Sequence, residues 1–520
     1  MATHAFRGIQ RLNRVLDASI RTLNSTLRCA STSSQTRIVS GSNGERIFLS
    51  SNDISYPETL LHEFVWNDIA NYPDHIALEC GIIGKKYTYA QAKDATNYIG
   101  RSLRNIGLKE GDMIALVAPN FPDTVLGLLG SLSGGLIVTT MNPYYTAASI
   151  ASITLAATRA CLPPETPFIV IDDKTGSIPE GSIPFDDLIT RGKSLSPVST
   201  KATCDNIAIL PFSSGTTGLP KGVMLTHRNL VSNIMMSQSC FGESFHPTTS
   251  TYQEKIPLII PFFHIYGLNG VALSRLAFGA KMVSIPKFIP ETFLDVMQKC
   301  KYKPHNTDPF KRVAIIFQGY GLTETSSVAF CEDGKKFSSI GKVVDGSKAR
   351  LVNIETQQDI VTPGETGELW IKGPHIMKGY LNNEAATTAT LTEDKWLKTG
   401  DIAYFDEDYD FFITDRMKEL IKVKGFQVPP AELEALLRTH PDVDEAAVVG
   451  IPHAKCGEVP KAFIVASKGK KPTEDDIKNF LKGKVSDYKE LKGGVTFINE
   501  IPKNASGKIL RMKLKNEYQS

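Results

Sequence analysis

Short apolar runs alternate with amphipathic helical patterns along most of the chain, from about residue 45 to residue 413. Runs rich in β-branched and other apolar residues occur at 136–140, 168–171 and 207–212, and residues 124–132 precede the first of them with a helical pattern. Such alternation predicts a parallel or mixed sheet that is covered by helices. We therefore expect a large layered α/β body.

The pattern changes after Arg416. Strands are expected at 420–423, 446–449, 462–466 and 495–498, and helices are expected to open at Pro429–Pro430 and at Thr473 and to form the basic C-terminal end. These elements describe a small α+β unit, of a size that can fold alone. The expected division is a leader of residues 1–40, an N-terminal domain of residues 41–414 and a C-terminal domain of residues 415–520.

Residues 1–40 differ from the rest in composition. They contain six arginines against one acidic residue, Asp17, and have no lysine and no glutamate. At helical spacing their leucines and isoleucines form one stripe, with five of the arginines opposite. This is typical of a mitochondrial transit peptide and predicts a matrix protein. The alternative is that this segment forms a helix docked on the body of a cytoplasmic or peroxisomal protein. The C-terminal residues are not the peroxisomal signal S-K-L.

The overall composition is that of an ordinary globular protein. The 520 residues are 42% hydrophobic and 22% charged, with a net charge of +3. No clustered basic face is indicated, so nucleic acid is not an expected partner. Eight scattered cysteines without a C-x-x-C pair predict neither a disulfide framework nor a zinc site. The most apolar stretch, residues 256–278, is broken by prolines and by charge, so no transmembrane segment is expected. The oligomeric state stays open.

A phosphate-binding loop follows the predicted strand at 207–212. Residues 213–222 read Ser-Ser-Gly-Thr-Thr-Gly-Leu-Pro-Lys-Gly. Glycines let backbone N–H groups converge on an anion, hydroxyls add donors, and Lys221 supplies a cation. The loop is not a Walker A motif, because Pro220 stands where that motif needs glycine. A flexible Ser/Gly hairpin is the alternative.

This loop resembles the signature of the adenylate-forming superfamily, which includes acyl-CoA synthetases, adenylation domains and insect luciferases. Further motifs that agree in order lie at 261–267, 318–324, 398–401, 415–428 and 502–508. The residues of these motifs are most similar to those of the 4-coumarate-CoA ligase and luciferase-like branch, and the resemblance covers about residues 45–518. The resemblance implies a large N-terminal α/β domain and a small, mobile C-terminal α+β domain.

The resemblance also implies an acid–thiol ligase. Such an enzyme takes ATP, Mg²⁺, coenzyme A and a small carboxylic acid, forms an acyl adenylate, and then forms the thioester. The sequence does not decide which acid is the substrate; aromatic propenoates and medium or long fatty acids are the candidates. The alternative is a catalytically impaired paralogue or splice form that binds nucleotide or a partner without completing the chemistry.

Site residues follow from the matched motifs. The phosphate contacts implied are Ser213, Ser214, Gly215, Thr216, Thr217 and Lys221. Thr323 is implied for the phosphates as well. Contacts to the rest of the adenylate are Tyr266, Gln318, Gly319, Tyr320, Asp401 and Arg416, and the metal contacts are Thr217 and Glu324. His264 and Lys508 are implied for adenylation, Lys422 and Gln427 for the second half-reaction, Lys287, Lys424 and Gly425 for coenzyme A, and Lys418 for the swing of the C-terminal domain. Taken alone, a Thr-Gly-Asp is more often a turn, and a lone histidine or lysine more often structural.

The chain departs from this family in three places. The distance from Asp401 to Arg416 fits one hairpin, with strands at 402–405 and 411–414, which could return Arg416 to the same nucleotide. Tyr409 stands in its turn, where family members carry a glycine, and a bulky residue is strained there if the turn requires a positive φ. Residues 288–318 leave room for one helix, 290–301, and one strand, 312–317, whereas a strand-crossover-strand unit needs about 30 residues or more. A smaller contraction falls at 149–164. We expect a shortened sheet with exposed edges, as skipped exons in a gene model or a splice variant would give.

Overall fold

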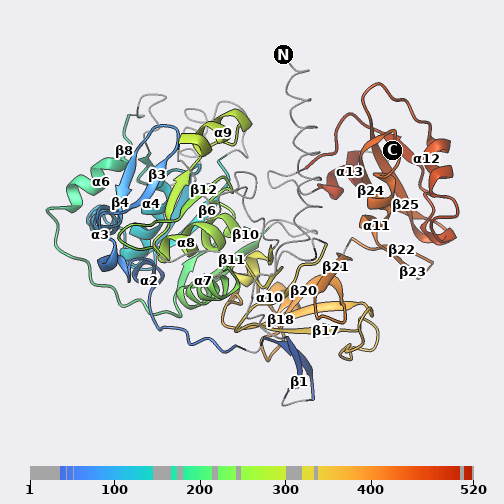
Figure 1. Ribbon diagram of the computed structural model, residues 1–520, viewed down its shortest axis with the longest axis horizontal. Helices are drawn as coiled ribbons and strands as arrows, with labels where there is room; N and C mark the ends of the chain where they lie inside the picture. The colour runs from blue at the N-terminus through green and yellow to red at the C-terminus, as the bar shows by residue number, and fades with distance from the viewer. Residues whose placement is uncertain are drawn as a thin grey trace.

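The structure is a computed structural model. It describes residues 36–41, 44–50, 52–143, 166–171, 178, 180–213, 221–241, 248–299, 319–332, 336, 338–417, 419–424, 426–503 and 509–517. The expected fold class is confirmed. Helices cover sheets in a large N-terminal part, and the C-terminal elements gather to one side of it, with an antiparallel sheet between them in the view of Figure 1.

The central sheet has the strand order β10-β11-β9-β6-β5, in which β5, β6 and β9 are parallel. Its strands are β5 (Met113–Val117), β6 (Ile137–Met141), β9 (Ile207–Ile209), β10 (Phe212–Ser213) and β11 (Lys221–Thr226). Antiparallel pairing of β11 with β9 returns the chain beside the strand that leads to the predicted phosphate loop. The loop is thus anchored at both ends in one sheet.

A second sheet has the order β12-β13-β3-β4. Its strands are β3 (Ile76–Cys80), β4 (Lys86–Thr88), β12 (Lys255–Leu258) and β13 (Lys281–Ser284). The helices around both sheets are α2 (Leu61–Val65), η1 (Ile69–Asn71), α3 (Tyr89–Asn105), α4 (Pro122–Ser133), α6 (Phe185–Gly192), α7 (His227–Phe241), η3 (Tyr266–Leu273), α8 (Ser274–Ala277) and α9 (Pro290–Lys299); a small pair is β7 (Ile169–Val170) with β8 (Ile183–Pro184). Helix α4 is buried almost throughout; most of its residues are apolar, and its one charged residue, Asp123, pairs with Lys85.

The third sheet, of order β1-β2-β17-β18-β20-β21, is antiparallel. Its strands are β1 (Arg37–Ser40), β2 (Arg46–Leu49), β17 (Lys348–Val352), β18 (Gly367–Lys372), β20 (Leu397–Phe405) and β21 (Phe411–Arg416). Nearby elements are β14 (Gly319–Tyr320), η4 (Thr323–Thr325), β15 (Phe330–Cys331), β16 (Lys342–Val343), β19 (Gly379–Tyr380) and α10 (Glu384–Thr390). The hairpin expected between Asp401 and Arg416 is present as β20 and β21.

The C-terminal elements form a sheet with its own apolar core. They are β22 (Ile421–Val423), β23 (Phe426–Val428), α11 (Pro430–Leu437), β24 (Val443–His453), β25 (Gly457–Ala466), α12 (Glu474–Leu481), η5 (Asp487–Lys489), β26 (Val495–Phe497) and α13 (Arg511–Glu517). The start signals act as expected: Pro430 begins α11, and the Thr473 side chain accepts the Asp476 N–H at the start of α12. The expected domain border at residue 414 lies within β21.

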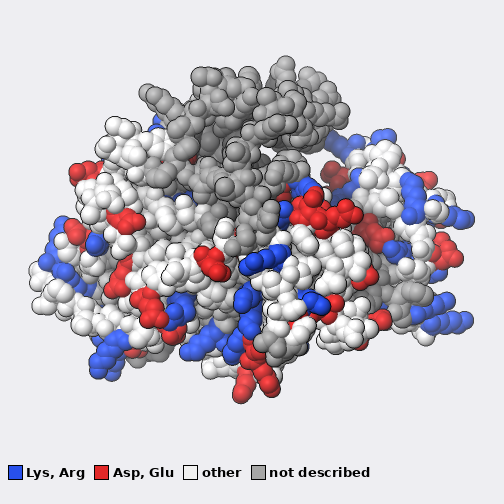
Figure 2. Space-filling model, turned by 60° about the horizontal axis from the view of Figure 1, so that its bottom comes forward, with Lys and Arg blue, Asp and Glu red and all other residues white. Residues whose placement is uncertain are grey.

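Other expectations concern cysteines, membrane segments and charge. Cys331 is disulfide-bonded, while Cys80, Cys204 and Cys456 are free thiols. No helix in the described part of the chain has the length and apolarity needed to cross a membrane. On the face shown in Figure 2, acidic and basic side chains of the described residues are interspersed. The strand expected at 312–317 and the contraction at 149–164 lie outside the described residues.

Candidate active site

The end of the phosphate loop meets an aromatic ring and a carboxylate. Lys221, the first residue of β11, places its ammonium 4.8 Å from the ring centroid of Tyr380. The Tyr380 hydroxyl donates to Oε1 of Glu324 at 2.8 Å. Burial, and secondly the Glu324 carboxylate, raises the pKa of Tyr380, so its phenol stays protonated and donates. Oε2 of Glu324 has no hydrogen-bond partner among the described residues, which leaves one oxygen for a cation such as Mg²⁺.

A second acidic side chain, Asp401, is held from two sides. The Tyr320 hydroxyl donates to Oδ2 of Asp401 at 2.6 Å, and Nε of Arg416 donates to Oδ1 at 2.7 Å. Asp401 pairs with Arg416 in the β20–β21 ladder, so the hairpin brings the two side chains together. Burial, and secondly Asp401, raises the pKa of Tyr320 well above its usual value. The hairpin thus brings Arg416 back to Asp401. Their contact with a nucleotide stays a prediction.

One short segment links these two groups. Tyr320 contacts Asp401 and Glu324 contacts Tyr380, and only three residues separate Tyr320 from Glu324. The turn between them is tight: a Cβ at Gly321 would lie 1.5 Å from the carbonyl oxygen of Ser327. Glycine is therefore needed at this position of the Gly319–Glu324 motif. The two acidic side chains belong to one site.

The backbone before Asp401 is fixed by a residue that the motifs did not reveal. The Gly400 N–H donates to Oε1 of Glu368 at 3.0 Å, and the indole of Trp370 donates to Oε2 at 2.7 Å. Gly400 has a φ of 70°, a conformation that favours glycine. Glu368 on β18 thus holds the irregular stretch of β20 that presents Asp401. Its Gly-Glu-Leu-Trp context carries no distinctive signal of that role.

His264 and Tyr266 lie at the start of η3. Nδ1 of His264 accepts the Tyr266 N–H at 3.2 Å, so Nε2 carries the proton of the neutral ring. The side chain of His264 reaches solvent, yet the protein around it lowers its pKa by desolvation. Asn120 holds this segment, since its amide accepts the Phe262 N–H and donates to the carbonyl of Ile260. His264 can therefore act as a neutral donor.

The residues expected to serve the thiol step lie on other elements. Lys422 and Gln427 are cross-strand partners in the β22–β23 hairpin, and the Lys422 side chain is exposed. Lys424 is exposed with a φ of 50°, and Lys287 is exposed after β13. The structure brings Lys422 and Gln427 into register. No contact joins these four residues to Asp401 or Glu324 among the described residues.

The remaining predicted site residues fall into two groups. Three of them lie on described elements: Ser213 on β10, Gly319 on β14 and Thr323 on η4. The predicted residues that lie outside the described part of the chain are Ser214, Gly215, Thr216, Thr217, Gln318, Lys418, Gly425 and Lys508. Their roles stay predictions.

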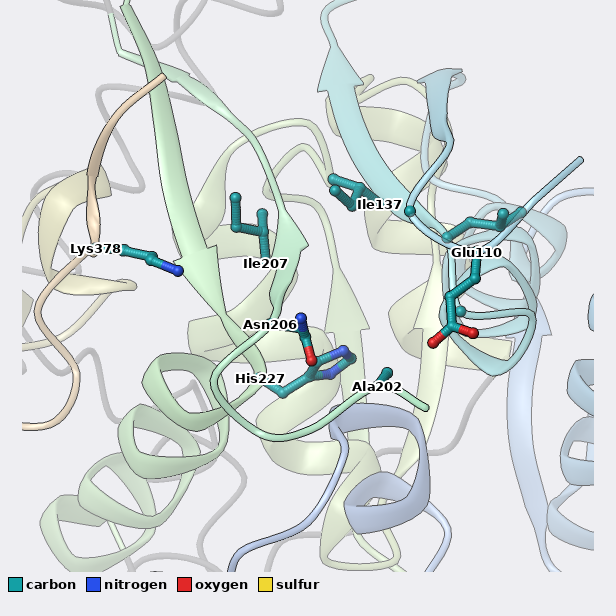
Figure 3. A pocket seen from close by; sticks show the side chains of 10 residues that line it. Glu110, Ile137, Ala202, Asn206, Ile207, His227 and Lys378 are labelled. Atoms are coloured by element: carbon teal, nitrogen blue, oxygen red, sulfur yellow. The ribbon is translucent and has the colours of Figure 1, made fainter. Parts of the chain in front are cut away.

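A pocket of 190 Å³ lies away from this site (Figure 3). Ile137 and Ile207, which line it, are the first residues of β6 and β9, so it lies at the amino ends of the parallel strands, whereas the phosphate loop follows their carboxyl ends. Its His227 is buried and accepts the Leu61 N–H through Nδ1. Burial, and secondly His62, lowers the pKa of His227 to about 3, so the ring is neutral. No predicted site residue lines the pocket.

Comparison with known proteins identifies the family. The model described as AMP-binding enzyme matches residues 65–307 and 302–381, and that of the AMP-binding enzyme C-terminal domain matches residues 432–508. The chain is 35% identical to 4-coumarate--CoA ligase 1 of Arabidopsis thaliana, covering 89% of this chain and 93% of that protein. It is 34% identical to a probable 4-coumarate--CoA ligase 1 of Dictyostelium discoideum, covering 89% and 96%. The chain belongs to the AMP-binding enzyme family, and the predicted class of acid–thiol ligase is confirmed.

Solved structures agree in fold. ATP-bound MatB from Rhodopseudomonas palustris superposes with a TM-score of 0.74 at 24% identity, covering 89% of this chain and 99% of that one. The anthranilate CoA ligase AuaEII in complex with anthranoyl-AMP gives a TM-score of 0.74 at 22% identity, covering 88% and 97%.

The comparisons also bear on the expected shortening. The match to the Arabidopsis protein spans 530 positions, more than the 520 residues of this chain, although only 89% of the chain enters it. The relative therefore has residues without a counterpart here. The family model matches in two segments that overlap at residues 302–307, within the region where the sequence predicts a missing segment.

Proposed function

We propose that the protein is an ATP-dependent acid–CoA ligase similar to the 4-coumarate-CoA and fatty acid-CoA ligases. In the first step a carboxylate oxygen of the acid attacks the α-phosphorus of ATP, and the bond to pyrophosphate breaks. In the second step the thiol of coenzyme A attacks the carbonyl carbon of the acyl adenylate, loses its proton and releases AMP. The names of the relatives support this reaction.

The observation that carries the proposal is the double anchoring of Asp401. A carboxylate that is 2% exposed, fixed by Tyr320 and Arg416, still has a lone pair on each oxygen for the two hydroxyls of a ribose. Because the two donors come from different elements, the carboxylate is held before nucleotide arrives. Preorganised groups lose less freedom on binding.

Charge at the phosphates is the second requirement. Lys221 supplies a positive charge, and Glu324 offers a carboxylate oxygen of the kind that Mg²⁺ prefers. The chemistry of this donor set fits magnesium, which would neutralise charge on the phosphates when bound. We assign Thr323 to the same phosphates, with Ser213 and the loop residues 214–217.

The remaining roles complete the cycle. Lys508 bridges the acyl carboxylate and the α-phosphate during adenylation, and His264 lies beside the acyl group. For the thiol step the C-terminal domain turns about Lys418 and presents Lys422 and Gln427. A swing of this kind separates the two half-reactions.

Carboxylate-dependent exchange of pyrophosphate into ATP tests the first step. The full chain is assayed with a panel of aromatic propenoates and fatty acids. We expect exchange with at least one acid, and its loss in Lys508→Ala. Asp401→Ala should raise the KM for ATP about 10- to 100-fold, because hydrogen bonds to a charged group contribute about 1.5–3 kcal/mol.

The exposed Asp444 gives a matched control, since Asp444→Ala should leave exchange unchanged. A chain that unfolds cooperatively yet exchanges with no acid would contradict the proposal and favour an impaired form, for which the comparisons offer no support.

A further inference from the structure

Tyr380 connects the two phosphate-site charges that the motifs assign, and no motif assigns a role to Tyr380 itself. We propose that Tyr380 is a positioning residue that sets the Glu324 carboxylate with its hydroxyl and the Lys221 ammonium with its ring, for binding of magnesium–ATP. The proposal rests on the proposed function of this site and names a determinant of its cation and nucleotide affinity.

The backbone around Tyr380 is fixed. Tyr380 pairs with Val223 in the ladder between β19 and β11, two residues beyond Lys221. The Leu381 N–H donates to the carbonyl of Gly222 at 2.9 Å, and the Tyr380 N–H donates to Oγ1 of Thr387 at 2.9 Å. Because the ring is only 6% exposed, it has little freedom to turn. The tyrosine is a rigid reference for both neighbours.

The hydroxyl acts on Glu324. It donates to Oε1 at 2.8 Å, while the Glu324 backbone carbonyl accepts the Met377 N–H at 2.9 Å. The segment that carries Tyr380 therefore holds both the main chain and the side chain of Glu324. A neutral donor orients a carboxylate without cancelling its charge, so Glu324 keeps its attraction for a cation.

The ring acts on Lys221. Its centroid lies 4.8 Å from the ammonium, within the range of a cation–π contact. Lys221 forms no salt bridge within the described residues. An aromatic face holds the ammonium near the loop while leaving its full charge for a phosphate. The ring also offers Lys221 a partner other than the Glu324 carboxylate.

Two substitutions separate the two contacts. Tyr380→Phe removes the hydroxyl and keeps the ring, whereas Tyr380→Leu removes both. ATP binding to the full chain is measured by titration calorimetry with and without Mg²⁺, and pyrophosphate exchange is measured against the Mg²⁺ concentration. Tyr404→Phe is the matched control, because Tyr404 stacks on Phe412 on the β20–β21 hairpin and has no role in the site.

We expect Tyr380→Phe to unfold cooperatively, at a lower temperature because a buried hydrogen bond is lost, and to need about tenfold more Mg²⁺, while ATP binding without Mg²⁺ is unchanged. Tyr380→Leu should also bind ATP more weakly without Mg²⁺. The control should match wild type. An unchanged Mg²⁺ requirement in Tyr380→Phe, or an equal loss of affinity with and without Mg²⁺, would overturn the proposal.

Measurements of ATP binding also distinguish the positioning role of Tyr380 from the proposed ligase function. If wild type binds ATP in a Mg²⁺-dependent way and the Phe variant needs about tenfold more Mg²⁺ for the same binding, Tyr380 has the proposed role even when no acid supports exchange. In that case only the ligase function fails. A wild-type chain that binds no ATP overturns both.

Discussion

Each of the two acidic side chains of the site accepts a hydrogen bond from a tyrosine hydroxyl. Tyr320 donates to Asp401 and Tyr380 donates to Glu324, and burial keeps both phenols protonated. A phenol fixes a carboxylate without neutralising it, whereas a lysine would compete with an incoming cation. Tyr380 therefore orients the Glu324 carboxylate and leaves its negative charge in place.

Tyr409 is the second residue-scale feature, and it was expected to be strained. Its φ is 62°, in the left-handed region, which costs an ordinary residue about 1–2 kcal/mol. Its ring compensates by packing on Phe405 and Phe48, at centroid distances of 6.0 and 6.3 Å. Aromatic pairs contribute about 0.5–1.5 kcal/mol each beyond the apolar area that they bury.

Because two aromatic contacts outweigh one strained φ, Tyr409→Gly should destabilise the protein by about 1 kcal/mol, although it restores the residue typical of the family. Urea unfolding measures the change. Lys395→Gly is the matched control: Lys395 is exposed, with a φ of 69°, and has no packing to lose. It should gain about 0.5–1 kcal/mol. Stabilisation by both substitutions would show that strain dominates at Tyr409.

At the scale of elements, local pairings could be predicted and distant ones could not. The β20–β21 hairpin followed from the short spacing between Asp401 and Arg416, and the starts of α11 and α12 followed from Pro430 and Thr473. The pairing of β19 with β11 could not be predicted, because two residues, Gly379–Tyr380, carry no period and their partner strand lies more than 150 positions away. Tyr380 was missed for that reason, and Glu368 was missed because its Gly-Glu-Leu-Trp context carries no distinctive signal.

A buried carboxyl group, that of Asp415, joins β21 to α11. Asp415 at the end of β21 accepts the N–H groups of Arg416 and of Ala431 in α11. Burial raises the pKa of Asp415 to about 6, above its usual 3.8. The folded protein therefore takes up the proton at a higher pH than the unfolded chain does. Ionised Asp415 is unfavourable at neutral pH, and acidification from pH 6 to pH 4 relieves this penalty.

Asp415→Asn should consequently raise the unfolding temperature at pH 7, and its advantage over wild type should shrink toward pH 4. Thermal unfolding from pH 4 to pH 8 measures both effects. Asp444→Asn, on an exposed residue, should show no such trend. An advantage that stays constant with pH would mean that the buried carboxylate is not the cause.

At the scale of the whole molecule, the order of the motifs was enough to predict the architecture. The shortened region at 288–318 sets the limit of what could be predicted. Five motifs in the order of the family predict its fold, and several of their described residues lie on strands, as residues 398–401 do on β20. They cannot say how the chain closes its sheet beyond β12, which has one strand neighbour, β13, among the described residues. Residues 302–312 carry no motif and no clear hydrophobic period.

Location is also a property of the whole chain. We propose that residues 1–40 direct the protein to the mitochondrial matrix, on the grounds of six arginines opposed by one acid and an expected apolar stripe. Residues 1–40 fused to a fluorescent protein should enter mitochondria. Replacing Arg7, Arg11 and Arg14 by glutamate should leave the fusion in the cytosol, because import requires positive charge on this face. Replacing them by lysine keeps the charge and should keep import. Cytosolic fluorescence of the unaltered fusion would mean that the basic segment serves the folded body instead.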